Sequence, residues 1–273
     1  MSKETKSILM KDKITLEGVE ETMFVPLIAR AIESKRKKPA FVDEVAVRVM
    51  DELNYDFSKH KAKMNIWGCA TRTVLFDNEA RQFIEANPTC TVINIASGLD
   101  NRFSRVDNGQ IQWYNIDLDN IINLRRGIFV EHERVTDIAC SALDYTWIEK
   151  IKDRDNVLII AEGIVMYFTE AETAQLFDTI AKSFSKVTAL VEVMSTKMVE
   201  RQNMHEITKT TSARFIWGLP KVNDFEKLCP MFSYVRDHNF TDGMKHYSPI
   251  FITIISPILR KLNNSIGVFV KKQ

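Results

Sequence analysis

The chain has 273 residues, of which 45% are hydrophobic and 27% are charged, and this composition is typical of globular proteins rather than of disordered or fibrous ones. Thirty-seven Lys and Arg residues oppose 36 Asp and Glu residues, so the net charge is +1. Such a small net charge gives no electrostatic argument for nucleic acid or an anionic membrane as the main partner. We therefore expect a small-molecule substrate.

The cysteines and the apolar runs bear on the cellular compartment of the protein. The four cysteines are widely spaced and form no C-x-x-C pair, so they predict neither a zinc site nor a disulfide framework. Residues 1–13 lack the continuous apolar stretch of a signal peptide. The apolar run 250–259 is about half as long as a membrane-spanning helix. We expect a cytoplasmic protein without a transmembrane segment or a metal site.

The first 90 residues are rich in helix-forming residues. They predict helices over residues 19–34, 42–53 and 71–86, the last of which ends at Asn87 because the residue before Pro88 is disfavoured in helices. Together these helices predict a helical N-terminal cap over residues 1–90.

From residue 91 onwards, strand-like runs alternate with helical segments. Residues 91–96, 157–161 and 187–193 are apolar without alternation, as in strands buried on both faces of a parallel sheet. Further strands are predicted over residues 111–116, 134–139, 232–239 and 266–271, and Thr169 and Glu172 form a capping box that starts a helix. The pattern predicts a doubly wound, Rossmann-like α/β fold, with 1–273 as one domain.

Two features at the ends of the first two strands suggest a nucleoside site. The first strand runs into a turn of small residues that contains Gly98, although a lone glycine here is a weak signal. Asp117 lies at the end of the next strand, about 20 positions later, where an acid can accept hydrogen bonds from both ribose hydroxyls. The alternative for Asp117 is a helix N-cap, a task that Asp119 could also perform. A nicotinamide dinucleotide is disfavoured because the turn lacks the full G-x-G-x-x-G pattern.

Glu162 follows the strand predicted over residues 157–161. A carboxylate is costly to bury without a partner, so the position implies an amino or guanidinium group nearby. That group could belong to a ligand, or it could be one half of a structural ion pair.

These residues, taken with several other motifs in order, resemble the leucine carboxyl methyltransferase family and, within it, the bacterial branch that acts on polyketide-like small molecules. The resemblance runs nearly end to end. It covers residues 19–33, 70–77, 93–102, 141–147 and 161–167 and the Trp217–Gly218 pair. It implies a class I methyltransferase that uses S-adenosyl-L-methionine, with a helical cap over the cofactor and an antiparallel last strand.

The resemblance also implies site roles. Arg72 corresponds to the arginine that binds the carboxylate of the cofactor's methionine moiety, Gly98 to the glycine of close backbone approach, and Asp117 to the ribose acid. Glu162 corresponds to the carboxylate near the methionine amino group. The remaining positions expected at the cofactor are Ala96, Leu118, Ser141 and Ala142.

Two positions depart from the family pattern. Ala96 stands where the family usually has glycine, and Ser141 and Ala142 stand where it usually has an acid followed by leucine. Asp144 could supply the missing acceptor for the adenine amino group or could cap a helix. These departures leave open a non-catalytic cofactor-binding relative.

Tyr167 is the catalytic candidate, as a hydroxyl that faces the substrate; its alternative is a core aromatic residue. His238 and His246 receive no role because neither has an acid or serine at a recognisable spacing. The expected activity is O-methylation of a carboxyl or hydroxyl group on a small organic molecule, with methylation of a protein C-terminal carboxylate as the alternative. Specificity is expected in residues 22–30 and 214–247.

Overall fold

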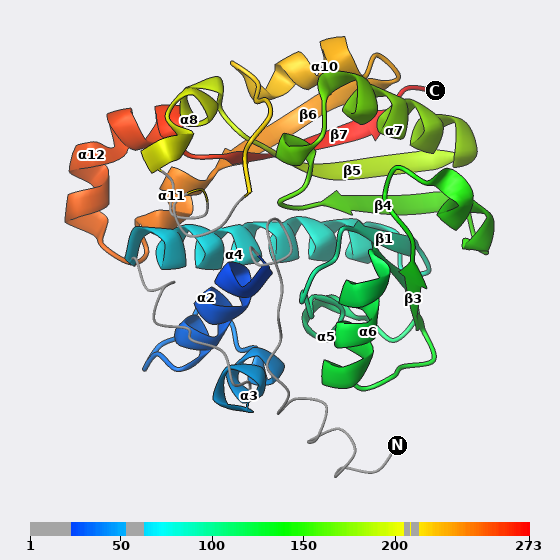
Figure 1. The fold of residues 1–273 in the computed structure, drawn as a ribbon, viewed down its shortest axis with the longest axis horizontal. Coiled ribbons are helices and arrows are strands. Elements are labelled where there is room, and N and C mark those ends of the chain that lie inside the picture. The colour runs from blue at the N-terminus through cyan, green and yellow to red at the C-terminus, as the bar shows by residue number, and fades with distance from the viewer. Residues whose placement is uncertain (1–22, 53–62, 205–207, 209–212) are drawn as a thin grey trace.

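The computed structural model describes residues 23–52, 63–204, 208 and 213–273, and the start of the first predicted helix, residues 19–22, lies outside these ranges. A seven-stranded sheet forms the centre of the molecule, in the order β3-β2-β1-β4-β5-β7-β6 (Figure 1). The strands are β1 (Thr91–Ile95), β2 (Gln112–Asp117), β3 (Val135–Ala139), β4 (Asn156–Ala161), β5 (Lys186–Val193), β6 (Phe232–Asn239) and β7 (Ser265–Lys271).

The sheet confirms the predicted fold class. Every neighbouring pair from β3 to β5 is parallel, and β7 is antiparallel to both β5 and β6. All five residues of β1 are buried, as its uninterrupted apolar run predicts for a strand covered on both faces. All seven predicted strands are present, and their ends differ from the prediction by one residue at most.

Helices cover both faces of the sheet. The described helices are α2 (Phe24–Ser34), α3 (Glu44–Glu52), α4 (Lys63–Ala86), α5 (Phe103–Val106), α6 (Asp119–Ile128), α7 (Glu170–Ser183), α8 (Thr196–Glu200), α10 (Phe225–Leu228), α11 (Phe240–Met244) and α12 (Pro249–Leu262). Short 3-10 helices span Tyr145–Lys150, Val165–Tyr167, Gln202–Met204 and Val222–Asp224. The capping box predicted at Thr169 starts α7, whose apolar side packs on one face of the sheet.

Helix α4 differs from its prediction in length and in role. It is described from Lys63 onwards, eight residues before the predicted start. Its C-terminal half packs Phe76, Ala80 and Ile84 on the second face of the sheet, so this half is a layer of the core. Its N-terminal half packs against α2, which in turn packs against α3; these two helices form the cap and lie below α4 in Figure 1. One helix thus joins the cap to the sheet.

The C-terminal region contains a helix that the sequence patterns did not predict. Helix α12 includes the apolar run 250–259, and Ile250 and Ile254 on it are 79% and 72% exposed. Among the described residues, no helix has both the length and the apolar character needed to cross a bilayer. The turn after α12 delivers Asn263 and Asn264 to the same edge of the sheet as the ends of β4 and β5.

Gly267 in β7 provides a test of this packing. A Cβ at Gly267 would lie 2.4 Å from the Phe269 ring and 2.7 Å from Val222, so we expect Gly267→Ala to destabilise the protein by about 1–3 kcal/mol. A Cβ at Gly127 in α6 would meet no atom within 4 Å other than its own helix backbone, so Gly127→Ala should stabilise the protein by about 0.5–1 kcal/mol. Urea unfolding measures both, and equal effects from the two variants would contradict this description of the sheet.

Candidate functional site

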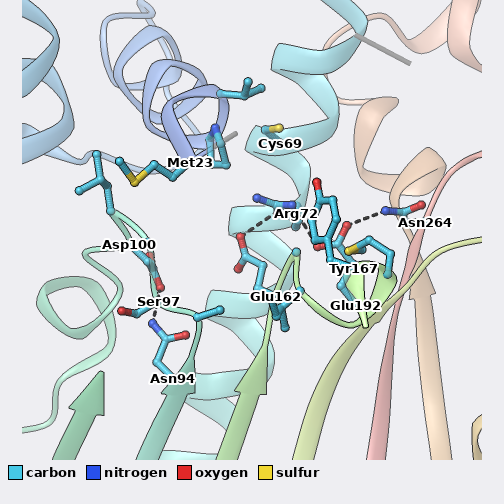
Figure 2. Close-up of a pocket in the computed structure, with 18 of the residues that line it drawn as sticks. Met23, Cys69, Arg72, Asn94, Ser97, Asp100, Glu162, Tyr167, Glu192 and Asn264 are labelled. Atoms are coloured by element: carbon cyan, nitrogen blue, oxygen red, sulfur yellow. Dashed lines mark hydrogen bonds and ion pairs between the residues drawn. The ribbon is translucent and has the colours of Figure 1, made fainter. Parts of the chain in front are cut away.

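A cavity of about 400 Å³ lies at the carboxyl edge of the parallel strands. Residues at the ends of β1, β2, β3, β4 and β5 form its floor, and α4, the start of α2 and the segment after α12 enclose it (Figure 2). Open α/β sheets bind their ligands at this edge. The cavity therefore unites the segments that the sequence singled out.

One face of α4 lines the cavity. Met64, Gly68 and Arg72 lie four residues apart and therefore lie one above another on the helix, with Asn65 and Cys69 beside them. The cap contributes Met23, Val25, Pro26 and Arg30. Part of the predicted specificity segment 22–30 thus lines the cavity; residue 22 lies outside the described residues.

The turn after β1 has a left-handed backbone. Ala96 has φ +51° and is the only non-glycine residue of the described chain with positive φ, while Gly98 has φ +48°. The amide of Gly98 donates to Asp117 Oδ2 at 2.7 Å, and Arg125 Nη1 donates to the Gly98 carbonyl at 2.7 Å. The turn is therefore fixed in shape, and it holds Gly98 beside Asp117.

Asp117 does not act as the N-cap of the following helix. Leu118 precedes α6 and makes no side-chain cap bond, and the second oxygen of Asp117 accepts from the Leu118 amide at 2.8 Å. Asp119 is the first residue of α6 and accepts from Asn123. The carboxylate of Asp117 therefore stays at the cavity wall.

Arg72 lies between two carboxylates. Its Nε is 2.8 Å from Glu162 Oε1, and its Nη1 donates to Glu192 Oε2 at 3.0 Å (Figure 2). Burial acts to lower the pKa of Arg72, but Glu192 and Glu162 outweigh it and hold that pKa above its ordinary value. Arg72 is therefore a permanently charged guanidinium that two strands hold in place.

Glu162 was expected to have a cationic partner, and it has two. Besides the Arg72 contact at Oε1, Arg102 Nη2 donates to Oε2 at 2.7 Å. Arg102 also donates to Asp77 and to Asp100, at 2.8 and 2.6 Å. Burial acts to raise the pKa of Asp100, but Arg102 and Arg105 hold that pKa well below its ordinary value. A buried network of charges thus supports the floor of the cavity from below.

The segment after β3 forms the side of the cavity. Cys140, Ser141 and Ala142 line it; Ser141 is exposed, and its Oγ accepts from the Leu143 amide at 3.3 Å. Asp144 accepts from the backbone and the hydroxyl of Thr146, and so caps the 3-10 helix Tyr145–Lys150. Of the two interpretations of Asp144, the structure supports the cap.

The end of the cavity beyond Glu192 is apolar. Met166, Met194 and Phe215 pack into a small cluster separate from the main core, and the Tyr167 ring lies 5.6 Å from the ring of Phe215. All four side chains line the cavity. Phe215 belongs to the predicted specificity segment 214–247.

The histidines lie elsewhere. His238 Nε2 is 2.7 Å from Glu79 on α4, and His246 packs edge-on against Tyr247. Neither lines the cavity. Within the described chain, no group of three or more His, Cys, Asp and Glu residues is arranged to hold a metal ion.

Sequence patterns missed two residues of the site. Glu192 lies near the end of the apolar run 187–193, which is the signal that singled out Glu162 after 157–161, so the same argument could have found it. Asn264 lies between α12 and β7 and donates to Glu192 Oε1 at 2.6 Å. No local pattern marks Asn264, because the turn after α12 is what delivers it.

Known methyltransferases resemble this chain in sequence. The sequence profile of the leucine carboxyl methyltransferase family matches residues 24–181. The tetracenomycin polyketide synthesis O-methyltransferase TcmP of Streptomyces glaucescens is 24% identical over 236 residues, which are 86% of this chain and 87% of that protein. The S-adenosyl-L-methionine-dependent methyltransferase dpfgK of Gibberella zeae is 31% identical over 199 residues, or 65% of each chain.

The fold also has counterparts among solved structures. The crystal structure of a methyltransferase-like protein from Thermobifida fusca superposes with a TM-score of 0.57 at 13% sequence identity. The match covers 90% of this chain and 94% of that one. At this identity the likeness concerns the fold alone.

The backbone of Ala96 gives a prediction. A left-handed conformation costs a residue with a Cβ about 1–2 kcal/mol, and glycine avoids that cost at some loss of chain entropy. We therefore expect Ala96→Gly to stabilise the protein by up to about 1 kcal/mol in urea unfolding. Ala161 ends β4 without positive φ, so Ala161→Gly should destabilise it. A loss of stability in both variants would show that Ala96 is unstrained.

Proposed function

This chain belongs to the leucine carboxyl methyltransferase family, and we propose that it transfers a methyl group from S-adenosyl-L-methionine to an oxygen of a small organic molecule. The observation that carries the proposal is the convergence of Arg72, Gly98 and Asp117 on one cavity at the carboxyl edge of the sheet. Each of the three offers what one part of that cofactor requires. We further propose that the chain acts as one cytoplasmic methyltransferase unit.

The residues of the cavity fit the cofactor. Arg72 would bind its carboxylate, Asp117 its ribose hydroxyls, and Leu118 and Ala142 the adenine ring, with Ser141 at the ring edge. The buried Oγ of Ser97 lines the cavity and has no hydrogen-bond partner among the described residues. A buried polar atom without a partner is costly, so a polar ligand here would relieve that cost.

The charges at the methionine end agree with this assignment. The cofactor carries an ammonium group beside its carboxylate, and Glu162 and Glu192 offer carboxylates on either side of Arg72. Gly163 next to Glu162 has φ +68°, and a Cβ there would lie 3.4 Å from Arg72 Nη1. A side chain at this position would therefore be in van der Waals contact with the guanidinium.

The bound cofactor supplies an electrophilic methyl group on a sulfonium centre. The protein contributes by holding the acceptor oxygen in line with that group and by excluding water. The apolar cluster of Met166, Met194 and Phe215 favours an apolar acceptor, because methionine side chains adapt to irregular ligands. Tyr167 borders this cluster and would orient the acceptor through its hydroxyl. A carboxylate acceptor needs no base, whereas a hydroxyl acceptor benefits from one.

The relatives support a small-molecule acceptor. The Streptomyces relative is named for polyketide synthesis, and the match to it extends over most of both chains. We therefore favour an apolar, polyketide-like acceptor over the C-terminus of a protein. Nucleic acid is not among the partners we propose.

Cofactor binding is the first test. In calorimetric titration of the full chain with S-adenosyl-L-methionine, we expect Arg72→Ala to weaken binding about 10- to 150-fold, because it removes a charge-assisted contact worth about 1.5–3 kcal/mol. Arg72→Lys should recover only part of the affinity, since an ammonium cannot reproduce the planar fork. Arg36 lies outside the cavity lining, so Arg36→Ala is the control. No heat from the unmodified chain at millimolar cofactor would reject the proposal.

The acceptor is the second test. The protein is incubated with methyl-labelled cofactor and either a metabolite extract or a whole-protein extract of the source cells. We expect label in small organic molecules only. Label in protein alone, as base-labile ester, would support the protein carboxyl alternative. Label in neither extract, in the presence of cofactor binding, would support a non-catalytic relative.

A further inference from the structure

Glu192 is a buried carboxylate at the carboxyl end of β5. Its side chain is 2% exposed, and it contributes to the cavity wall. Among the described residues, each of its oxygens accepts one hydrogen bond: Arg72 Nη1 donates to Oε2 at 3.0 Å, and Asn264 Nδ2 donates to Oε1 at 2.6 Å (Figure 2). Helix α4 and the turn before β7 thus meet at this one carboxylate.

The donors of Arg72 are divided between two strands. Nε lies 2.8 Å from Glu162 Oε1 just after β4, in an ion pair without hydrogen-bond geometry, and Nη1 donates to Glu192 near the end of β5. Within the described part of the chain, Nη2 donates no hydrogen bond. A guanidinium is a rigid planar fork, so fixing Nε and Nη1 also fixes the direction of Nη2.

The two carboxylates are not equivalent. Glu162 shares its charge with Arg102, which donates to its second oxygen. Among the described residues, Arg72 is the only cationic partner of Glu192. A buried charge without a partner is costly. If Arg72 moved away, Glu192 would lose its cationic partner while Glu162 would keep Arg102, so the pair with Glu192 restrains Arg72 more than the pair with Glu162 does.

We propose that Glu192, itself oriented by Asn264, is a positioning residue that holds Arg72 ready for the carboxylate of S-adenosyl-L-methionine. The role rests on the proposed function, because Arg72 is its point of contact with the cofactor. A long arginine side chain loses conformational freedom when it binds a ligand, and affinity rises when that loss has already occurred in the free protein. Glu192 therefore acts on binding through Arg72.

The test uses two ligands that differ at one end. S-Adenosylhomocysteine carries the aminocarboxylate group, and 5′-methylthioadenosine lacks it. In calorimetric titration of the full chain, we expect Glu192→Gln to weaken S-adenosylhomocysteine about tenfold and to change 5′-methylthioadenosine less than about twofold. Asn264→Ala should have the same selective effect, at a smaller size, and it provides an independent measurement if Glu192→Gln does not fold.

A matched control is available at Glu79. It is buried on α4 and pairs with Arg236, but it lies outside the cavity lining. Glu79→Gln removes a buried charge of the same kind, so we expect it to lower thermal stability while leaving the affinity for both ligands unchanged. An equal loss of both ligands in Glu192→Gln would mean that Glu192 supports the cavity in general, and it would overturn the proposal.

A double variant tests whether the effect passes through Arg72. In the Arg72→Ala background, Glu192→Gln should change the affinity for S-adenosylhomocysteine less than about twofold, because the group that it positions is gone. A full tenfold effect in that background would overturn the positioning role and leave the proposed function intact. Failure of the unmodified chain to bind either ligand would reject the proposed function and this role with it.

Discussion

The site depends on the ion pairs of Arg72 with Glu162 and Glu192. Arg72 is on α4; Glu162 lies just after β4 and Glu192 next to the last residue of β5, and these two strands are neighbours in the sheet. The same helix buries Phe76 and Ala80 against the sheet one and two turns later. The apolar contacts therefore hold α4 against the sheet, and the ion pairs hold the face that carries Arg72 toward the ends of β4 and β5. The cap packs on α4. One helix thus fixes the position of the cap residues that line the cavity relative to the strand ends that form its floor.

The buried charged side chains of Arg72 and its two glutamates are tolerated because each of them contacts at least two polar or charged side chains, which come from other helices, strands or loops. Arg102 follows β1 and joins Asp77 on α4 to Glu162 after β4, and Arg105 on α5 also reaches Asp77. Removing one member of such a network leaves a buried charge unpaired, which costs far more than an exposed pair contributes. The network adds little net stability by this reasoning, but it fixes the geometry of the polar groups that face the cavity.

The sequence predicts the sheet well because strands buried on both faces must be largely apolar, and β1, β4 and β5 are. It predicts α4 poorly because residues 63–70 face the cap and the cavity as well as the core, so no single apolar stripe marks them. Glu162 was predictable as a carboxylate that ends a buried strand, and Glu192 carried the same signal. Arg72 was identified by family resemblance alone, since an arginine in a helix is exposed by default. Asn264 depends on tertiary structure that no local pattern encodes.

In the proposed complex, Arg72, held between the two glutamates, is the anchor for the carboxylate of the cofactor. A crystal structure of the full chain with S-adenosylhomocysteine tests it most directly. We predict that the ligand carboxylate contacts the Arg72 guanidinium while the Arg72–Glu192 pair stays intact, and that the ribose hydroxyls contact Asp117. A ligand bound in this cavity with its carboxylate away from Arg72, or an Arg72 that has left Glu192 to reach it, would contradict the account.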